Sequence, residues 1–348
     1  YLCPRRFAAL LRRGPNSPVE MRLLAKLLVW QVTNASGDRA QISLRGPAEQ
    51  GTWTQLSAEG CEPARCSLHV DGGCPFYQAR QAALSAHILI VNHALLLSDV
   101  SNENLVLPPY DRLIVDEAHH LEDATTNGLS FYVDLNTIRR WLDTLGDVKS
   151  GLLGEMLAQC QSVIPPTHYA KLSEYTEQTA DLAYAMKHHA EQFFLGLQNF
   201  IDSQMPGQGS DYARHERILA SLRKQPGWGD VEAKWDVMSR FIEGMIKAMG
   251  ELTRGLDGLE SYSIPERDNL YDGLLTAKRN LAELLGRLSE LVSEPAPNMI
   301  YWATIPSGGS GISIHVAPLD IGPLVQQHLW FAKDTVILTS ATLRANNS

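Results

Sequence analysis

The sequence predicts an α/β fold in which a parallel sheet is interrupted by a long helical segment. Residues 111–115 form an apolar strand that leads into Asp116 and Glu117, and 335–338 form a second one that leads into Thr339 and Ser340. Such short apolar runs are typical of buried parallel strands. The segment 126–300 has apolar residues at helical spacing, which predicts an all-α insert of about 170 residues.

The remaining elements follow from local patterns along the chain. We predict helices over 19–30 and 76–84, a turn at Gly37, a loop over 31–60 and a buried strand over 87–91. Within 126–300, a helix begins near Asp134 or Asn136, and long helices cover 231–256 and 274–292. Alternating residues then predict strands over 299–303 and 312–316.

Length and composition limit the class of protein. With 348 residues, of which 44% are hydrophobic, the chain has room for two or three globular domains. It has no apolar run of 18 residues, and its start has neither Met nor a signal-peptide pattern. We therefore expect an internal fragment of a longer cytoplasmic protein that does not associate with membranes.

Charge is distributed unevenly along the chain. The net charge is -9, but residues 1–80 contain ten Lys/Arg against six Asp/Glu, while the rest contains twenty against thirty-three. A basic module on an acidic body is compatible with a local DNA footprint. Ordinary variation of the surface charge is an equally good explanation at this point.

Asp116 and Glu117 are candidates for nucleotide chemistry. Ligands of open α/β sheets bind at the carboxyl ends of the strands, where this pair lies. One carboxylate is suited to hold Mg²⁺ and the other to orient or deprotonate an attacking water. The alternative is that both are solvated ends of a strand turn.

Cysteine spacing suggests a metal centre near the start of the chain. Four of the five cysteines are Cys3, Cys61, Cys66 and Cys74, and the last three lie in a Gly- and Pro-containing stretch. Four thiolates fit a structural zinc or an iron–sulfur cluster, and unliganded buried thiols are the third possibility. Cys160 lies alone in a helical region, where a small buried hydrophobic residue is expected.

Three motifs carry a resemblance to a known family. Asp116-Glu117-Ala118-His119, the later segment 339–343 (Thr-Ser-Ala-Thr-Leu) and the segment 91–96 (Val-Asn-His-Ala-Leu-Leu) resemble motifs of superfamily-two helicases of the DinG/XPD branch. The resemblance implies part of a RecA-like parallel-sheet motor domain with a loop-rich iron–sulfur insertion and an all-α arch insertion. The implied domains are iron–sulfur, 1–80; motor, 81–125; arch, 126–300; and motor again, 301–348.

The resemblance also implies site residues. Asp116 would bind Mg²⁺, Glu117 would act on the attacking water, and His119 would link the nucleotide site to the later motif. Ser340 and Thr342 would belong to the nucleotide site, while Asn92 and His93 either cap a turn or help couple the sites. The four clustered cysteines would hold a [4Fe–4S] cluster. Nucleic-acid contacts are expected from Arg5, Arg6, Phe76 and Tyr77.

The resemblance implies an ATP-dependent helicase that moves 5′ to 3′ on single-stranded DNA and separates forked duplexes, as a monomer. Two alternatives are a non-catalytic DNA-binding or redox-responsive iron–sulfur module, and a helicase-like subunit that needs a partner lobe. The chain has no G-x-x-x-x-G-K-[ST] phosphate loop, and the Gly-rich stretch 307–311 lacks the lysine. We therefore expect no ATP hydrolysis by this chain alone.

Overall fold

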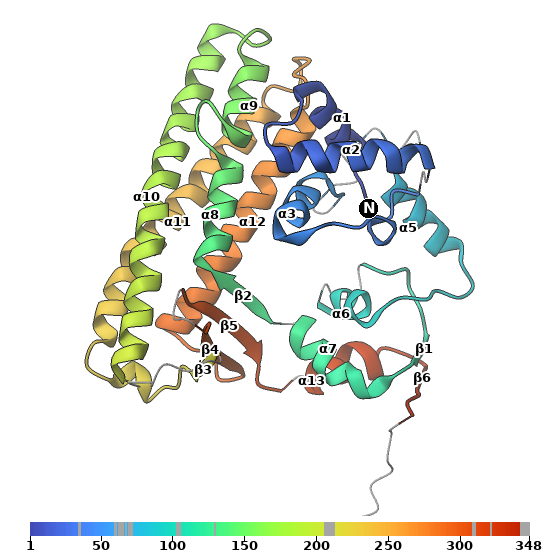
Figure 1. The fold of residues 1–348 in the computed structure, drawn as a ribbon, viewed down its shortest axis with the longest axis vertical. Coiled ribbons are helices and arrows are strands. Elements are labelled where there is room, and N and C mark those ends of the chain that lie inside the picture. Colours follow the sequence, from blue (N-terminus) through green and yellow to red (C-terminus); the bar gives the residue numbers. More distant parts are fainter. Residues whose placement is uncertain are drawn as a thin grey trace, which may run out of the picture. The chain divides into compact units, whose positions relative to one another are not determined.

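The structure is a computed structural model, drawn in Figure 1. It describes residues 1–33, 36–58, 61, 66, 68, 72–101, 106–128, 130–204, 213–307, 311–320 and 322–341. The chain divides into two compact units, each assembled from three segments. Unit 1 contains Tyr1–Ile88, Asp147–Thr176 and Glu251–Ala277, and unit 2 contains Leu89–Gly146, Glu177–Gly250 and Lys278–Ser348.

Unit 1 is helical in the part that the structure describes. Its shorter helices are α1 (Pro4–Arg13), α2 (Pro18–Thr33), α3 (Gly46–Leu56), α5 (Pro75–Ser85) and α9 (Gly151–Cys160), with a 3-10 turn at Arg39–Gln41. Apolar side chains of α1, α2 and α3 form a common core. Its buried members are Leu2, Phe7, Leu10, Leu23, Leu27, Trp30, Ile42, Trp53 and Leu56. This core fixes the start of the chain against α3.

Unit 2 contains a parallel pair of strands, β1 (Arg112–Val115) and β6 (Thr335–Leu338). They correspond to the strands predicted over 111–115 and 335–338. Ile114 is paired with Ile337, and both are exposed. The buried residue Val115 packs with α6 (His93–Ser101), α7 (Leu121–Gly128) and the segment of α13 (Gly322–Val325) and Gln326–Trp330. Among the described residues, no third strand joins this pair.

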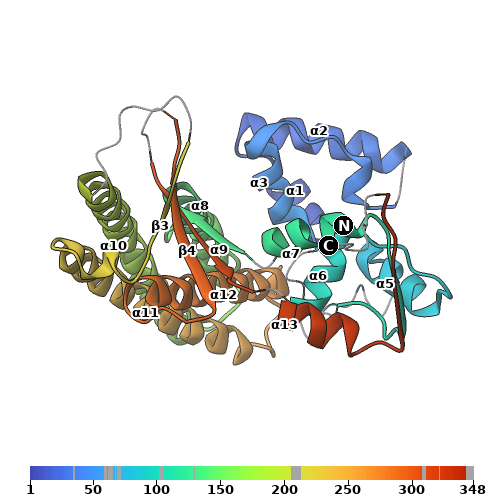
Figure 2. The same ribbon diagram turned by 90° about the horizontal axis from the view of Figure 1, so that it is seen from below.

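Unit 2 also contains an antiparallel sheet of four strands, in the order β2, β5, β4, β3. Their bounds are β2 (Phe131–Asp134), β3 (Arg214–Arg217), β4 (Met299–Ile305) and β5 (Ser313–Pro318). Figure 2 shows β3 and β4 beside the long helices. Alternate residues of β4 and β5, such as Ala303 and Ile314, are buried, as a sheet with one covered face requires.

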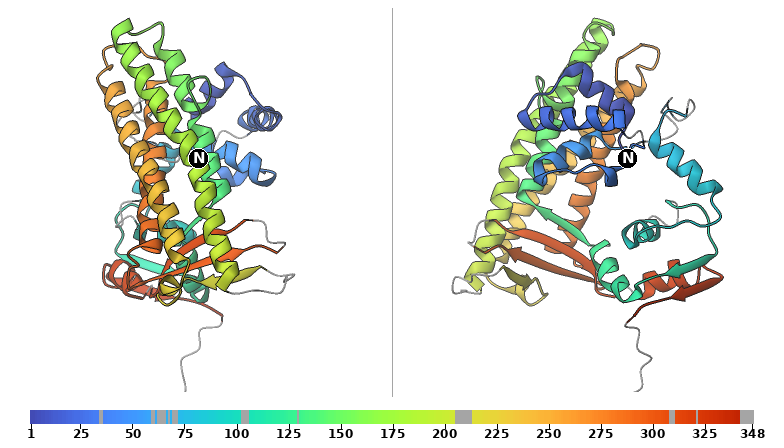
Figure 3. Two further views of the ribbon diagram at one scale, coloured as in Figure 1. Left: turned by 90° about the vertical axis from the view of Figure 1, so that its left-hand side faces the viewer. Right: turned by 45° about the vertical axis from the view of Figure 1, so that its right-hand side comes forward.

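Four further helices are α8 (Leu135–Leu145), α10 (Pro166–Gln204), α11 (Trp228–Asp257) and α12 (Arg267–Val292), with a 3-10 turn at Leu222–Lys224. Helices α10 and α11 run side by side in both views of Figure 3. Aromatic pairs join them in unit 2: ring centroids are 5.6 Å apart for Phe193 and Trp235, and 5.2 Å apart for Phe200 and Trp228.

Three expectations about the elements were wrong. The insert is not all-α, because β2 and β3 lie within 126–300 and pair with β5 and β4; strands of four residues give too short a pattern to be recognised alone. Residues 87–91 form no strand: Ile88 and Ile90 are 82% and 92% exposed, and within the described part of the chain no strand pairs with this segment. The predicted loop over 31–60 contains α3.

Within the described part of the chain, no helix combines the length and apolar character needed to cross a membrane.

Candidate functional site

The ends of the two parallel strands bring Asp116 and Thr339 together. The hydroxyl of Thr339 donates a hydrogen bond of 2.5 Å to the Asp116 carboxylate, and the backbone N–H of Glu117 donates one of 3.0 Å. Both donors favour the ionised carboxylate, and they lower the pKa of Asp116 below its ordinary value, with Thr339 as the larger cause. Asp116 is therefore an exposed anion at the edge of the sheet.

Glu117 has an unusual backbone conformation. Its φ is 49° and its ψ is 44°, which is the left-handed region that a non-glycine residue rarely adopts. The next residue continues the contact between the strands, since the Ala118 N–H donates to the Thr339 carbonyl at 2.9 Å. Glu117 is exposed and directly follows Asp116 in the sequence. Strained residues of this kind occur often at functional sites.

His119 forms a second link between the two strand ends. Its Nδ1 lies 2.7 Å from the Ser340 hydroxyl and 3.3 Å from the Glu117 carboxylate. The histidine thus contacts one residue from each predicted motif. Thr342, the other predicted residue of this motif, lies outside the described residues.

His93 reaches the same edge from α6. Its Nε2 lies 3.0 Å from the backbone carbonyl of Asp116. Asn92 caps this helix, because its side-chain oxygen accepts a hydrogen bond of 2.9 Å from the Leu95 N–H. Both alternatives for this segment therefore have a structural counterpart: Asn92 caps the turn, and His93 contacts the acidic segment.

The site offers exposed carboxylates but no preformed cage for a cation. Among the described residues, no group of three or more His, Cys, Asp or Glu side chains is arranged to hold a metal ion. Mg²⁺ commonly binds through one or two carboxylates together with waters and substrate phosphates. The arrangement at Asp116 is compatible with that mode of binding.

Cys3 and Cys74 occupy equivalent positions in unit 1. Each is buried, and each immediately precedes a helix, α1 or α5, that begins with proline. The two segments lie close together, since the rings of Tyr1 and Phe76 have centroids 6.2 Å apart. A Cβ added at Gly37 would lie 2.7 Å from the Pro75 Cβ, so a glycine is required where this helix start packs.

Cys61 and Cys66 lie in the same neighbourhood. Burial raises the pKa of Cys61 to about 12, and the charges of Asp272, Cys66 and Cys3 add to this effect. The four thiols therefore have the number and type of a cluster's donor set, and Cys61 is near enough to Cys3 and Cys66 for their charges to act on it. The described geometry places no three of them at metal-binding distances.

Arg5 and Arg6 both have partners within unit 1, and the nucleic-acid contact expected of them stays a prediction. Arg5 donates to Asn269 at 2.5 Å, Asp268 at 3.2 Å and Asp272 at 2.8 Å, and its side chain is only 16% exposed. Arg6 donates to the Ser57 carbonyl at 2.6 Å. Arg5 is held in this way because Asp272 is buried and requires a cation.

The two aromatic residues predicted to contact DNA, Phe76 and Tyr77, lie in the first turn of α5. Both are half-buried. Phe76 contacts Tyr1, as described above.

Comparisons with known proteins agree with the motifs. Residues 67–138 match the DEAD_2 family model. The whole chain is 26% identical to the 3′-5′ exonuclease DinG of Bacillus subtilis and spans 37% of that protein. It is 23% and 22% identical to the ATP-dependent DNA helicases DinG of Escherichia coli K12 and Salmonella typhimurium, and spans 49% of each.

The chain is thus similar to proteins named as DinG over its whole length. The comparisons confirm the resemblance to DinG-type helicases that the motifs predicted. The chain spans half or less of the length of these relatives.

The roles of two residues were not predicted from the sequence. Thr339 was identified only as part of a motif, although it is the residue whose side chain donates a hydrogen bond to Asp116. Its place directly after an apolar strand was the available signal. Asp272 lies in an ordinary amphipathic helix, α12, and no local pattern reveals that it pairs with a residue 267 positions away.

Proposed function

We propose that the intact protein is an ATP-dependent DNA helicase of the DinG type, and that this chain contains part of its nucleotide site. The observation that supports this most directly is the pair of contacts between strand ends, from Thr339 to Asp116 and from His119 to Ser340. A helicase must transmit the state of its nucleotide to its DNA-binding surface. Contacts of this kind provide a physical route between the two motifs.

Each residue has a proposed role. Asp116 contributes to Mg²⁺ binding, and its lowered pKa keeps it ionised. Glu117 orients or deprotonates the attacking water. His119 senses the position of Ser340 through their 2.7 Å contact. In the intact protein these steps drive 5′ to 3′ movement on single-stranded DNA and the separation of forked duplexes.

We also propose that Cys3, Cys61, Cys66 and Cys74 hold a [4Fe–4S] cluster. The burial of three of these thiols and their shared neighbourhood support the proposal. When bound, the cluster would cross-link segments that are distant in the sequence. The residues of this chain supply the thiolates and the helix starts at Pro4 and Pro75 that position two of them.

Hydrolysis is tested with Glu117→Gln in the full-length protein. This substitution keeps the size of the side chain but removes its charge, so we expect ATP binding to persist while the hydrolysis rate falls at least 100-fold, a typical effect of losing a general base. Asp116→Asn should weaken Mg²⁺-dependent nucleotide binding instead. Glu232→Gln, an exposed change on α11, is the matched control. Normal hydrolysis by Glu117→Gln would refute the assignment.

Coupling is tested with a double-mutant cycle on His119 and Ser340. If their contact carries the signal, His119→Ala and Ser340→Ala should each reduce the stimulation of ATP hydrolysis by single-stranded DNA. The double variant should lose little more than either single one, because both remove the same contact. Additive losses would show that the two residues act separately.

The name of the Bacillus subtilis relative makes a nuclease the second candidate for the intact protein. The two activities are separated with a forked substrate labelled on both strands. A helicase releases full-length strands in the presence of ATP and Mg²⁺, whereas an exonuclease shortens them. Substrates with only a 5′ or only a 3′ single-stranded arm report the direction of movement.

A further inference from the structure

Unit 1 contains a cavity of about 450 Å³ between α2 and the start of α3. It is lined by Arg22, Ala25 and Lys26 of α2 and by Arg45 and Glu49 at α3. Three of these five residues are cations and one is an anion. The lining therefore has an excess of positive charge, although the whole chain is acidic.

The single carboxylate neutralises only one of the three cations. Glu49 is 3% exposed, and it accepts hydrogen bonds of 2.7 Å from the Arg45 N–H and 2.5 Å from the Lys26 amino group. These two bonds lower the pKa of Glu49 below its ordinary value, so the side chain is ionised at neutral pH. Lys26 and Glu49 thus form an ion pair in the lining of the cavity.

The two arginines at the cavity, Arg22 of α2 and Arg45 before α3, differ from three arginines of α1. Arg5, Arg12 and Arg13 all have acidic partners. The guanidinium groups of Arg22 and Arg45 are exposed, and no hydrogen bond or ion pair to a described residue engages either of them; Arg22 acts on Glu49 only through its charge. Two forked donors therefore line one cavity with their hydrogen-bonding capacity unused.

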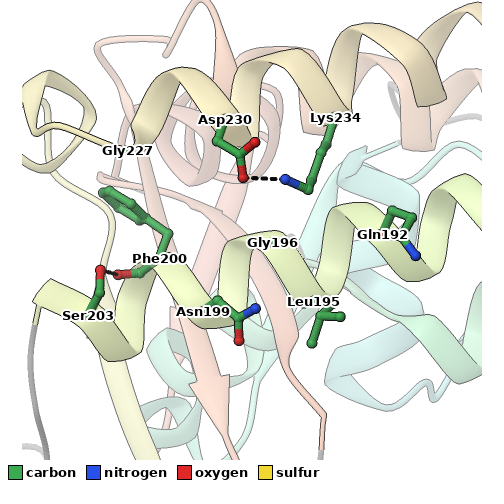
Figure 4. A pocket seen from close by; sticks show the side chains of 9 residues that line it. All are labelled: Gln192, Leu195, Gly196, Asn199, Phe200, Ser203, Gly227, Asp230 and Lys234. Carbon is green, nitrogen blue, oxygen red and sulfur yellow. Dashed lines mark hydrogen bonds and ion pairs between the residues drawn. The ribbon is translucent and has the colours of Figure 1, made fainter.

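A second cavity, of about 340 Å³ in unit 2, provides the contrast shown in Figure 4. Its charged residues, Asp230 and Lys234, form an ion pair with each other. The side chain of Lys234 packs over Gly196, where an added Cβ would approach it to 2.6 Å. This cavity has no uncompensated charge, so an anion gains nothing there.

We propose that the cavity of unit 1 binds a backbone phosphate of single-stranded nucleic acid through Arg22 and Arg45. This proposal rests on the proposed helicase function and assigns its DNA contact to residues other than Arg5 and Arg6. A planar guanidinium matches a phosphate with two parallel hydrogen bonds. The Lys26–Glu49 pair joins α2 to α3, so the backbone segments that carry the two arginines are held together before the ligand arrives.

A phosphate contact has a distinctive salt dependence. Removing two such contacts from a single-strand complex should flatten the slope of log affinity against log salt by about 1.4, since each contributes about 0.7. We therefore compare the full-length protein with its Arg22→Gln/Arg45→Gln variant, measuring the binding of a labelled oligonucleotide by fluorescence anisotropy from low to high salt. Both residues are exposed, so the fold should survive.

The control removes the same charge from unit 1 at another place. Lys171→Gln/Arg254→Gln lowers the positive charge by two but leaves the cavity intact. Its salt slope should match that of the unaltered protein. If both double variants flatten the slope equally, the effect is one of total charge, and the cavity is not the site.

Two ligands identify what the cavity recognises. With an abasic oligonucleotide, which keeps its phosphates, Arg22→Gln/Arg45→Gln should flatten the salt slope as much as it does with an ordinary strand. An oligonucleotide with uncharged methylphosphonate linkages should bind the variant and the unaltered protein equally. If inorganic phosphate at a few millimolar displaces the abasic strand from the unaltered protein, the cavity is a site for free phosphate, and the proposal is wrong.

The same samples separate this proposal from the helicase assignment. ATP binding and hydrolysis depend on Asp116 and Glu117, which lie in unit 2. Normal hydrolysis without DNA, together with an unchanged salt slope in Arg22→Gln/Arg45→Gln, would refute the cavity alone. If the unaltered full-length protein does not hydrolyse ATP, the proposed function is refuted instead.

Discussion

Thr339 donates its hydroxyl hydrogen to the carboxylate of Asp116 across 2.5 Å, although 223 positions separate the two residues. The contact exists because β1 and β6 pair in parallel, so that both strands end at the same edge. It joins the acidic motif to the later one directly. Any change in the position of one strand end therefore changes the hydrogen bonding of the other.

The first prediction concerns the ionisation of Asp116. Thr339→Val removes the largest of the three causes that lower its pKa, so the pKa should rise towards that of an ordinary carboxyl group. A lowered pKa in the folded state stabilises the fold above the unfolded pKa, and this stability is lost as pH falls through the folded value. In Thr339→Val, the pH range over which protonation of Asp116 destabilises the fold should therefore become narrower.

The measurement is a titration of the Asp116 carboxyl carbon by nuclear magnetic resonance. Thr335→Val is the control, because it makes the same change at the start of β6, whereas Thr339 directly follows the end of that strand. An unchanged pKa in Thr339→Val would show that the hydrogen bond does not control the charge.

The second prediction concerns the buried ion pair of unit 1. Arg5→Ala leaves Asp272, which is 2% exposed, without its cation, and this should reduce the free energy of unfolding by about 3 kcal/mol. Burial already raises the pKa of Asp272, so the protonated form should relieve the defect at low pH. The loss should therefore be smaller at pH 4 than at pH 7.

Urea denaturation at both pH values tests this expectation. Adding Asp272→Asn to Arg5→Ala removes the unpaired charge and should recover part of the stability at pH 7. Arg254→Gln, on an exposed pair with Glu251, should cost less than about 1 kcal/mol. Equal costs at the two positions would mean that Asp272 does not need a cation.

The third prediction concerns the backbone of Glu117. Because its φ is 49°, Glu117→Gly should be tolerated, whereas Glu117→Val should cost about 1–3 kcal/mol. At Glu232, within α11, the order should be reversed, since glycine weakens a helix more than valine does. Thermal unfolding of the four variants gives both orders. If valine were the better residue at both positions, the left-handed conformation of Glu117 would be wrong.

The fourth prediction concerns the cysteines. Protein purified without oxygen should be brown and contain about four irons per chain, as one [4Fe–4S] cluster requires. Cys66→Ser should lose the metal and loosen the fold of residues 1–80, because ligand binding is coupled to local folding. Cys160→Ser removes a buried thiol of α9 and should keep the iron. One zinc and no iron would exclude the cluster.

The strands and helices were predicted correctly where the residues that determine them lie within one short segment. The strands at 112–115 and 335–338, the helix start at Asp134 and the long helices α11 and α12 are all present, and Asp134 caps α8 by accepting a hydrogen bond of 2.7 Å from the Thr137 N–H. Each of these depends on residues within a few positions of one another. Periodicity and capping are local properties, so the sequence displays them directly.

The errors concern features that depend on distant partners. The segment 87–91 has the composition of a strand, but no strand among the described residues pairs with it, whereas β2 and β3 have weak patterns and are stabilised by β5 and β4. The partners of Arg5 were not predicted for the same reason, since they lie more than 260 positions away. Of the candidate site, the motif residues were predicted, but the contact between Thr339 and Asp116 was not.

The exposed parallel pair has a practical consequence for work with this chain as a separate polypeptide. Ile114 is 68% exposed and Ile337, its neighbour in the register, is 49% exposed, while the described residues supply no further strand on either side. Apolar strands with open edges are templates for pairing with other molecules. Concentrated samples of the isolated chain should therefore scatter light increasingly, and a solubilising fusion partner beside β6 would be the first remedy in its preparation.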